Sequence, residues 1–370
     1  MLQKKMMNHL IYIIFSLFFA LEPSGNFCRE AGSGDLINDG PYITLIKNKL
    51  KVKWIENSVY REEILTSGNF NEIRKKFGFS FSYDDLTNIY HLKSECNQTY
   101  INIDSIGVIS DVHGEYNTYI NLLKRVGIVD KNLRWSFGSG HLVILGDVFD
   151  RGDMVTEVFW HLFGLEKQAE QAGGMVHVLL GNHEFMVLRN DLAETNEKYR
   201  KVEKLASSRY ADLYSEKSVL GRWLRTKPVI ITINDILFVH GGISMEMALK
   251  KLKIRQINKV FTNQVVGRNL PELYEIEGLK FLNQSKGPIW YRGYFNDSTF
   301  CETKIDSILT FYGKKHLVVG HTPKPEITSL FNTKILGADA GIMNNQPGEM
   351  VIYKNGSFYK CDSNGRRIKL

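Results

Sequence analysis

The sequence predicts an α/β protein with parallel strands, because short apolar segments alternate with helical segments along the middle of the chain. Residues 106–109, 142–145 and 175–180 are apolar runs of strand length, and residues 119–126 and 155–165 between them have helical periodicity. A turn of glycine and polar residues follows each of these strands. In an α/β sheet such turns lie together beyond the carboxyl ends of the strands, where ligands bind.

The first residues are typical of an export signal. Lys4 and Lys5 precede an uncharged apolar run at residues 10–21, which is roughly 18 Å long as a helix and therefore shorter than the roughly 30 Å of a bilayer core. We predict a signal peptide at residues 1–22 and an exported protein, periplasmic or secreted. Two alternatives keep the chain at a membrane: an uncleaved apolar helix, or acylation of Cys28, which the bulky Phe27 fits poorly.

The residues after this segment predict a linker and then a small β structure. Residues 23–41 are rich in Gly, Ser, Asn and Asp, as linkers are. Residues 42–65 alternate apolar and polar side chains around turn-like breaks, which predicts an antiparallel hairpin or meander. We therefore expect an N-terminal β extension over residues 42–103 and the main domain over residues 104–370.

The later part of the chain adds a helical insertion and more strands. Residues 191–226 are charged and compatible with helices, which predicts an insertion over one face of the sheet. A second insertion is expected at residues 253–286. Further strands are predicted at residues 228–233, 236–239, 316–319, 335–336 and 350–353. Asn355-Gly356 predicts a tight hairpin turn after the last of them.

The composition is that of a folded globular protein. The 370 residues are 43% hydrophobic and 24% charged, and the net charge of +7 is spread without blocks of like charge. This mild excess suits phosphorylated partners, and the sequence has no motif or basic stripe that reads nucleic acid, so we predict no nucleic-acid partner. The wide spacing of the four cysteines excludes a CxxC metal site, and it leaves both disulfides and free thiols open: Cys28, Cys96, Cys301 and Cys361.

Polar clusters follow five of the apolar strands, and we expect them to converge. They read SDVHG at residues 110–114, GDVFDRG at 146–152, GNHE at 181–184, HGG at 240–242 and GHT at 320–322. Any one of these turns has an ordinary structural explanation, but five in one chain are hard to explain in that way. The side chains collected are Asp111, His113, Asp147, Asn182, His240 and His321, with Asp150, Arg151 and His183 beside them.

Neutral imidazoles and carboxylates in this number suit a pair of divalent transition metal ions, with a carboxylate such as that of Asp147 bridging them. Two ions roughly 3.5–4 Å apart activate a shared water and stabilise an in-line displacement at phosphorus. The predicted chemistry is therefore phosphoester hydrolysis. We assign the remaining histidines to structural positions, among them His141 at the start of a strand and His177 within one.

These motifs resemble those of the calcineurin-like metallophosphoesterases, and more closely those of PPP-type protein phosphatases. LLGNHE at residues 179–184, GPIWYRGY at 287–294 and VVGHT at 318–322 are similar to the Shewanella-like branch. The resemblance implies a β-sandwich flanked by helices in residues 104–370. Ser110 and the GHT element depart from the eukaryotic serine/threonine enzymes, which weakens any transfer of their residue preference and regulatory subunits.

The resemblance also implies a role for each site residue. One metal would be held by Asp111, His113 and Asp147. The other would be held by Asp147, Asn182, His240 and His321. A metal-bridging hydroxide would attack phosphorus, His183 oriented by Asp150 would protonate the departing oxygen, and Arg151 and Arg292 would bind the phosphate. Manganese is the first choice of metal, with iron or zinc as alternatives.

The sequence therefore predicts a dimetal phosphomonoesterase that acts on a phosphorylated protein, with phosphotyrosine favoured over phosphoserine or phosphothreonine. The alternative is a dinucleoside polyphosphate hydrolase or another small-molecule phosphoesterase on the same fold. A catalytically silent binding protein is a weaker interpretation, since none of the expected ligands is missing. Any membrane contact would be made only through the N-terminal segment, if it is uncleaved or lipidated.

Overall fold

The computed structural model describes residues 36–47, 49–91, 98–262, 266, 279–344 and 346–370. The predicted signal peptide, most of the predicted linker, Cys28 and Cys96 lie outside these residues. Within the part of the chain that is described, no helix is both long enough and apolar enough to cross a membrane. Residues 37–370 make up one compact unit.

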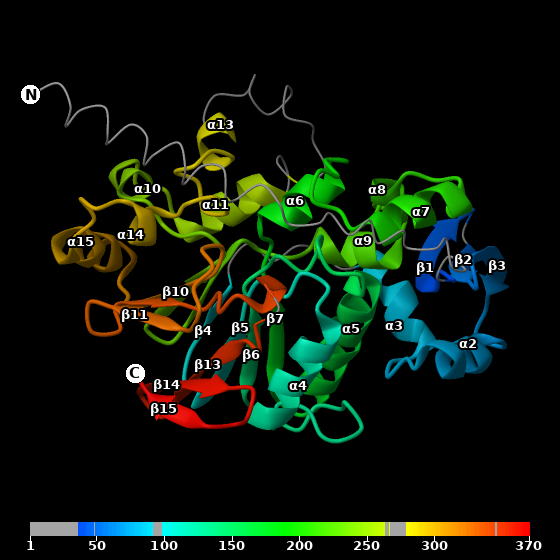
Figure 1. Cartoon of the computed structure of the whole chain (residues 1–370), viewed down its shortest axis with the longest axis horizontal. Helices are drawn as coiled ribbons and strands as arrows, with labels where there is room; N and C mark the ends of the chain where they lie inside the picture. Colours follow the sequence, from blue (N-terminus) through cyan, green and yellow to red (C-terminus); the bar gives the residue numbers. More distant parts are fainter. Residues whose placement is uncertain (1–35, 48, 92–97, 263–265, 267–278, 345) are drawn as a thin grey trace, which may run out of the picture. The chain divides into compact units, whose positions relative to one another are not determined.

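Two six-stranded sheets form the centre of this unit (Figure 1). The first sheet has the order β15 (Arg367–Lys369), β14 (Ser357–Asp362), β13 (Glu349–Lys354), β5 (Ser105–Ile109), β6 (His141–Ile144) and β7 (Met175–Val178). The second has the order β11 (Thr328–Leu330), β12 (Ile335–Gly337), β10 (His316–Val319), β9 (Ile236–Val239), β8 (Ile230–Ile233) and β4 (Thr99–Tyr100). The predicted α/β fold with a β-sandwich is confirmed.

The strands that carry the predicted site are parallel within each sheet. β5, β6 and β7 run parallel, with Ile109 opposite Ile144 and Ile144 opposite Val178. β9, β10 and β12 run parallel in the second sheet, with Val319 opposite Val239. Each of these strands therefore ends at the same edge of its own sheet, as the alternation of strands and turns predicted.

Strand alternation divides the core into two layers. Ile106 and Val108 of β5 belong to a buried cluster between the sheets that also contains Phe238 of β9 and Val318 of β10. Ile109, on the opposite face of β5, belongs to the larger cluster that the helices cover. Because successive side chains of a strand point to opposite faces, near-continuous apolar strands can serve both layers.

Two long helices cover the first sheet. α4 (Tyr116–Val126) buries Tyr119, Leu122 and Leu123, and it ends at Gly127, whose φ of 86° suits a left-handed C-cap. α5 (Val155–Gln171) packs against β7. Both helices were predicted, and both extend beyond the predicted ranges. Between β7 and β8 lie α6 (Asn182–Leu188) and then α7 (Glu197–Ala206), α8 (Tyr210–Leu213) and α9 (Val219–Leu224). The last three correspond to the helical insertion predicted at residues 191–226, whereas α6 precedes it.

The N-terminal part is a three-stranded antiparallel meander beside these helices (Figure 1). Its strands are β1 (Asp39–Ile46), β2 (Lys49–Glu56) and β3 (Val59–Leu65), so the predicted meander is present and begins at Asp39. The sheet contacts α5, α7 and α9, and Trp160 of α5 donates to the carbonyl oxygen of Pro41 at 2.8 Å. The small sheet is thus attached to the main domain through a buried contact.

Helices rather than strands follow the meander, and the sequence analysis did not predict them. They are α2 (Phe70–Phe77), α3 (Tyr83–Asn88) and the 3-10 helix η1 (Ile89–His91). Ser82 and Asp85 form a capping box at the start of α3, and Gly78 closes α2 with a φ of 67°. These capping residues were visible in the sequence and were the signal that could have located both helices.

The remaining helices of the described residues lie between β9 and β10 in the chain, except for a 3-10 helix after β12. They are α10 (Met245–Leu249), α11 (Ile254–Val260), α13 (Leu279–Leu282), α14 (Gly293–Asn296), α15 (Glu302–Tyr312) and the 3-10 helix η3 (Ile342–Asn344). The second predicted insertion is described only in part, through α11 and α13. The predicted hairpin turn between β13 and β14 is present, with left-handed φ values of 47° at Asn355 and 84° at Gly356.

Candidate metal and phosphate site

The five polar turns converge around the side chain of Asp147. Its Oδ2 atom lies 3.2 Å from Nε2 of His240 and 3.8 Å from Nε2 of both His113 and His183. These residues follow β6, β9 and β5 and begin α6, so four separate segments supply them. All four side chains are buried. The convergence that the sequence analysis expected is therefore present in the structure.

A second set of ligand-type atoms adjoins the first. Nε2 of His240 lies 3.0 Å from Oδ1 of Asn182 and 3.1 Å from Nδ1 of His321. Among the residues that the structure describes, two groups have ligand atoms within 4.8 Å of one another: His113, Asp147 and His183, and also Asp147, His240 and His321. Asp147 is common to both groups, which is the position expected of a carboxylate that bridges two ions.

Asp111 borders this cluster. Its Oδ1 atom is 4.0 Å from Nε2 of His113, and its Oδ2 atom accepts hydrogen bonds from Oγ of Ser110 at 2.5 Å and from the backbone nitrogen of His321 at 2.9 Å. Ser110, the residue that departs from the usual glycine of the first motif, thus orients the Asp111 carboxylate.

Backbone carbonyl groups fix two of the histidine rings. Nδ1 of His113 lies 2.7 Å from the carbonyl oxygen of Phe149, and Nδ1 of His240 lies 2.9 Å from that of Leu145. Because a carbonyl oxygen only accepts, Nδ1 is the protonated nitrogen and Nε2 of each ring faces Asp147 as a potential ligand. His321 has a buried Nε2 atom without a hydrogen-bond partner.

The loops around the cluster have strained backbones. The φ values are positive, between 46° and 70°, at six non-glycine residues of the site: Asp111, His113, Asp147, Asp150, Arg151 and His321. Such conformations persist only where many contacts fix them, and they concentrate at functional sites. Gly181 is required here, because a Cβ at this position would lie 2.2 Å from Oδ1 of Asp147.

Glu184 holds two of these loops together. Its buried carboxylate accepts hydrogen bonds at 2.8 Å from the backbone nitrogens of Asp147, Val148 and Gly181. The sequence analysis did not include Glu184 among the site residues. The signal was available in the GNHE motif, where an acidic residue follows Gly181, the N-cap of α6, by three positions.

His183 is oriented by Asp150 and adjoins Arg151. Nδ1 of His183 lies 2.7 Å from Oδ2 of Asp150, so its Nε2 points toward Asp147 and Arg151. Arg151 places Nη1 2.8 Å from Nε2 of His113 and Nη2 3.4 Å from Nε2 of His183. Arg292 donates to the carbonyl oxygen of His321 and has Nη2 3.3 Å from its Nδ1. Both predicted arginines therefore reach the cluster.

The electrostatics of the cluster depend on burial and on Asp147. Burial lowers the pKa of His113 to about 3 and that of His321 to about 2, so both rings are neutral near pH 7. Burial also lowers the pKa of His240, but the attraction of the Asp147 carboxylate outweighs it and raises the value to about 9. For His183, the Asp147 and Asp150 carboxylates likewise outweigh burial and raise the pKa. Binding of a cation at His240 would therefore release a proton.

The donor set fits divalent transition metal ions. Imidazole, carboxylate and amide donors meet at one buried point, where Nδ1 of the neutral His321 ring lies 3.1 Å from Nε2 of His240. The guanidinium groups beside His113 and His321 would have to move when ions bind. Arg151 has room for this because its side chain is one-third exposed.

One further carboxylate near the cluster was missed from the sequence. Asp339 follows β12 and is 1% exposed, with an Oδ2 atom that has no hydrogen-bond partner. Burial and then the negative charge of Asp111 raise its pKa well above the usual value. A polar residue directly after a short apolar strand, in the run LGADAG, was the same signal that identified the other site residues.

Comparison with known proteins agrees with this geometry. Residues 105–325 match the family described as calcineurin-like phosphoesterase, which is more than half of the 370 residues, and the chain belongs to this family. It is a metal-dependent phosphatase. The resemblance to Shewanella-like protein phosphatases that the motifs predicted is confirmed by matches to proteins of that name from Plasmodium berghei and Arabidopsis thaliana and to a Shewanella phosphatase structure.

Three relatives cover most of the domain. The crystal structure of a cold-active protein-tyrosine phosphatase from Shewanella sp. is 34% identical with a TM-score of 0.82, and the match covers 90% of this chain and 99% of that one. Shewanella-like protein phosphatase 1 of Plasmodium berghei is 28% identical over 63% of this chain and 66% of its own. An uncharacterised protein of Schizosaccharomyces pombe is 30% identical over 66% of this chain and 75% of its own.

Proposed function

We propose that this protein is a dimetal phosphomonoesterase that removes phosphate from tyrosine residues of proteins. The observation that carries the proposal is the position of Asp147 between two groups of histidines, with two arginines at their border. When bound, two divalent cations would activate water for attack at phosphorus and offset the charge of the phosphoryl group. Manganese is our first choice, and iron and zinc suit the same donors.

The protein's own side chains supply the proton and the phosphate contacts. His183 has its Nδ1 hydrogen bonded to Asp150, so its Nε2 faces the cluster, and the raised pKa favours the protonated ring. We assign His183 as the general acid that protonates the departing oxygen. Arg151 and Arg292 present planar guanidinium groups, which bind two phosphoryl oxygens at once.

A cavity beside Arg292 supports an aromatic substrate. It has a volume of about 710 Å³ and is lined by residues that include Phe281, Trp290, Arg292 and His321. The Trp290 ring meets that of His321 edge to face, with centroids 5.9 Å apart. Aromatic walls next to a phosphate-binding arginine favour a phosphorylated phenol over a phosphorylated alcohol. The similarity to a protein-tyrosine phosphatase over nearly its whole length supports the same substrate class.

The test compares substrates on one preparation. The full chain is purified metal-free, resupplied with Mn²⁺, and assayed with a phosphotyrosine peptide, a phosphoserine peptide of the same sequence and diadenosine tetraphosphate. We expect the highest kcat/KM on the phosphotyrosine peptide and no turnover after chelation. Turnover of the nucleotide alone would favour the dinucleoside polyphosphate hydrolase, and silence on all three substrates with each of the three metals would favour a binding protein.

We also propose that the protein is exported. The basic start and the short apolar run at residues 10–21 support this location. Expression of the full chain followed by N-terminal sequencing of the mature protein tests the proposal. A new N-terminus after about residue 22 in the periplasm or medium is expected, and an intact Met1 in the cytoplasm would contradict it.

A further inference from the structure

The Asp150-Arg151 pair needs external support. Both residues have left-handed backbones, with φ values of 70° and 65°, although neither is glycine. Conformations of this kind are unfavourable for residues other than glycine and persist only where the surroundings fix them. The support comes from a segment more than forty residues further along the chain, residues 194–199, which we call the brace.

The brace bonds to the backbone on both sides of the pair. The backbone nitrogen of Arg151 donates to the carbonyl oxygen of Glu194 at 3.0 Å, and Nδ2 of Asn196 donates to the carbonyl oxygen of Arg151 at 2.7 Å. Further along, Lys198 donates to the carbonyl oxygen of Asp153 at 2.6 Å and is paired with Asp39 of β1 at 2.9 Å. The catalytic loop is thus held through the brace to the N-terminal sheet.

The side chain of Thr195 acts on the carboxylate of Asp150. Oγ1 of Thr195 donates to Oδ1 of Asp150 at 2.7 Å, while Oδ2 of the same carboxylate lies 2.7 Å from Nδ1 of His183. Thr195 and Asp150 are 7% and 1% exposed. Little water is available to replace the Thr195 hydroxyl group. Its hydrogen bond to Oδ1 therefore fixes the plane of the Asp150 carboxylate, and Oδ2 is left to accept from His183.

We infer that Thr195 is a positioning residue that holds Asp150, and through it the His183 ring, in the orientation for proton transfer. The inference rests on the proposed role of His183 as general acid. Carboxylate torsions are broad, so without the hydroxyl group the Asp150 plane is free to rotate and the His183 ring loses its fixed direction. Displacements of this size at a reacting group lower rates strongly, although no ligand is lost.

Two small aryl phosphates that differ in their leaving groups test the inference, and the result does not depend on which phosphoprotein the enzyme prefers. The phenolate that departs from phenyl phosphate is strongly basic and needs a proton. The 2,4-dinitrophenolate that departs from 2,4-dinitrophenyl phosphate is a stable anion and does not. We expect Thr195→Val, which keeps the shape but lacks the hydroxyl group, to lower kcat on phenyl phosphate by about tenfold and on the dinitrophenyl ester by less than about twofold. The matched control Thr195→Ser keeps the hydroxyl group and is expected to stay within about twofold on both esters.

Three outcomes would overturn the inference: an equal loss on both esters, no loss on either, or a Ser variant as impaired as the Val variant. Metal content and the unfolding midpoint are measured for each variant. If Thr195→Val does not fold, Thr195→Ala is measured instead. In an Asp150→Asn background, Thr195→Val is expected to have no further effect on phenyl phosphate, because it acts only through Asp150.

The proposed function fails in a different way. If His183→Asn loses equal activity on both esters, the general-acid role is wrong and the inference fails with it. If His183→Asn is selective for phenyl phosphate and Thr195→Val is not, only the inference about Thr195 is wrong.

Discussion

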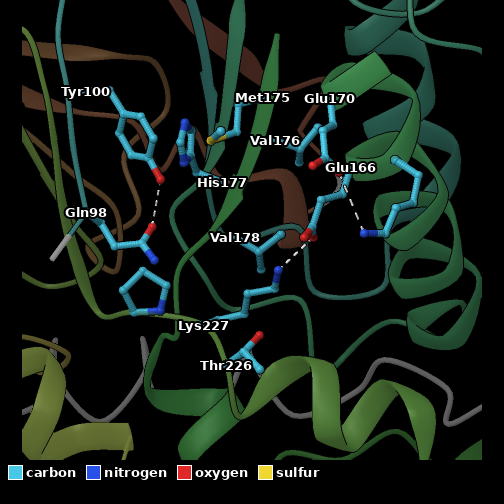
Figure 2. Close-up of a pocket in the computed structure, with 12 residues that line it drawn as sticks. Gln98, Tyr100, Glu166, Glu170, Met175, Val176, His177, Val178, Thr226 and Lys227 are labelled. Carbon is cyan, nitrogen blue, oxygen red and sulfur yellow. Dashed lines mark hydrogen bonds and ion pairs between the residues drawn. The ribbon is translucent and has the colours of Figure 1, made fainter. Parts of the chain in front are cut away.

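In the described part of the chain, two clusters of buried histidines differ in the groups that surround them. One surrounds Asp147 at the carboxyl ends of the strands. The other, which we call the edge cluster, lies where β7 and residues 226–228, just before β8, border a cavity of about 260 Å³, and Figure 2 shows the residues that line this cavity. It consists of His141, His177, Glu166 and Lys227.

In the edge cluster the polar atoms bond to one another. Nζ of Lys227 lies 2.7 Å from Oε2 of Glu166 (Figure 2). The same oxygen accepts from Trp223 at 2.7 Å, and Nε2 of His177 lies 3.0 Å from Nδ1 of His141. In the site, one carboxylate faces several imidazole nitrogens. Burial is common to both clusters, so burial alone does not identify a metal site, whereas convergence of ligand atoms on a shared carboxylate does.

The largest effect is expected for Asp147→Asn. The substitution keeps the size of the side chain but removes the negative charge that both histidine groups share, so bound metal and activity should both be lost, with kcat/KM lower by about a thousandfold or more. Metal content by mass spectrometry and turnover of phenyl phosphate check this. Retention of both ions at full activity would show that the convergence on Asp147 has no function.

A smaller loss is expected for His183→Asn. This residue lies in the Asp147 cluster but supplies a proton in our scheme, so the variant should keep its metal while kcat on phenyl phosphate falls by about a hundredfold. Loss of metal together with activity would instead assign His183 as a ligand. The same metal and turnover measurements distinguish the two results.

The edge cluster should affect stability and not catalysis. Lys227→Met keeps the packing against Trp223 but leaves Glu166 without its cation, so the free energy of unfolding should fall by about 2 kcal/mol while kcat stays within about twofold. Urea unfolding measures the change. The double variant Lys227→Met/Glu166→Gln is the control and should recover part of the loss. A large fall in kcat in a folded Lys227→Met protein would mean that the edge cluster takes part in the reaction.

The smallest effect concerns pH. Burial lowers the pKa of His141 from an ordinary value of 6.5 to about 4, and it lowers that of His177 as well. Between these pH values the unfolded chain takes up protons that the folded protein does not, so stability is full above about pH 6.5 and falls as the pH decreases toward 4. Unfolding midpoints across this range should fall less steeply for His177→Gln than for the wild type. Equal slopes would show that the pair is not neutral in the folded protein.

Much of the fold followed from local patterns. The apolar runs located β5, β6, β7, β9 and β10 because buried strands must be apolar, and Asn355-Gly356 located its hairpin because both residues tolerate a positive φ. The short strands β4, β11 and β15 were missed, since two or three residues carry no usable periodicity. The helices α2 and α3 were missed although their caps were present in the sequence.

The site likewise contains residues that the sequence predicted and residues that it did not. Asp147, His183 and the other motif residues were identified because each follows an apolar strand that predicts its place at a sheet edge. Thr195 was not identified, because it lies in a polar loop without a strand before it, and its bond to Asp150 joins residues forty-five positions apart. Two free thiols, one exposed at Cys301 and one buried at Cys361, show that the described cysteines are not paired with each other.

The sequence by itself determined the class of fold, the motif residues and the kind of chemistry, since strand periodicity and residue type are local properties of the chain. The tertiary structure supplied the distances that place Asp147 between two histidine groups, as the motifs predicted. Only the tertiary structure decided that Glu184 joins their loops and that the brace orients Asp150. These relations are distances between segments far apart in the chain. Packing of the two sheets sets such distances, and no local pattern contains them.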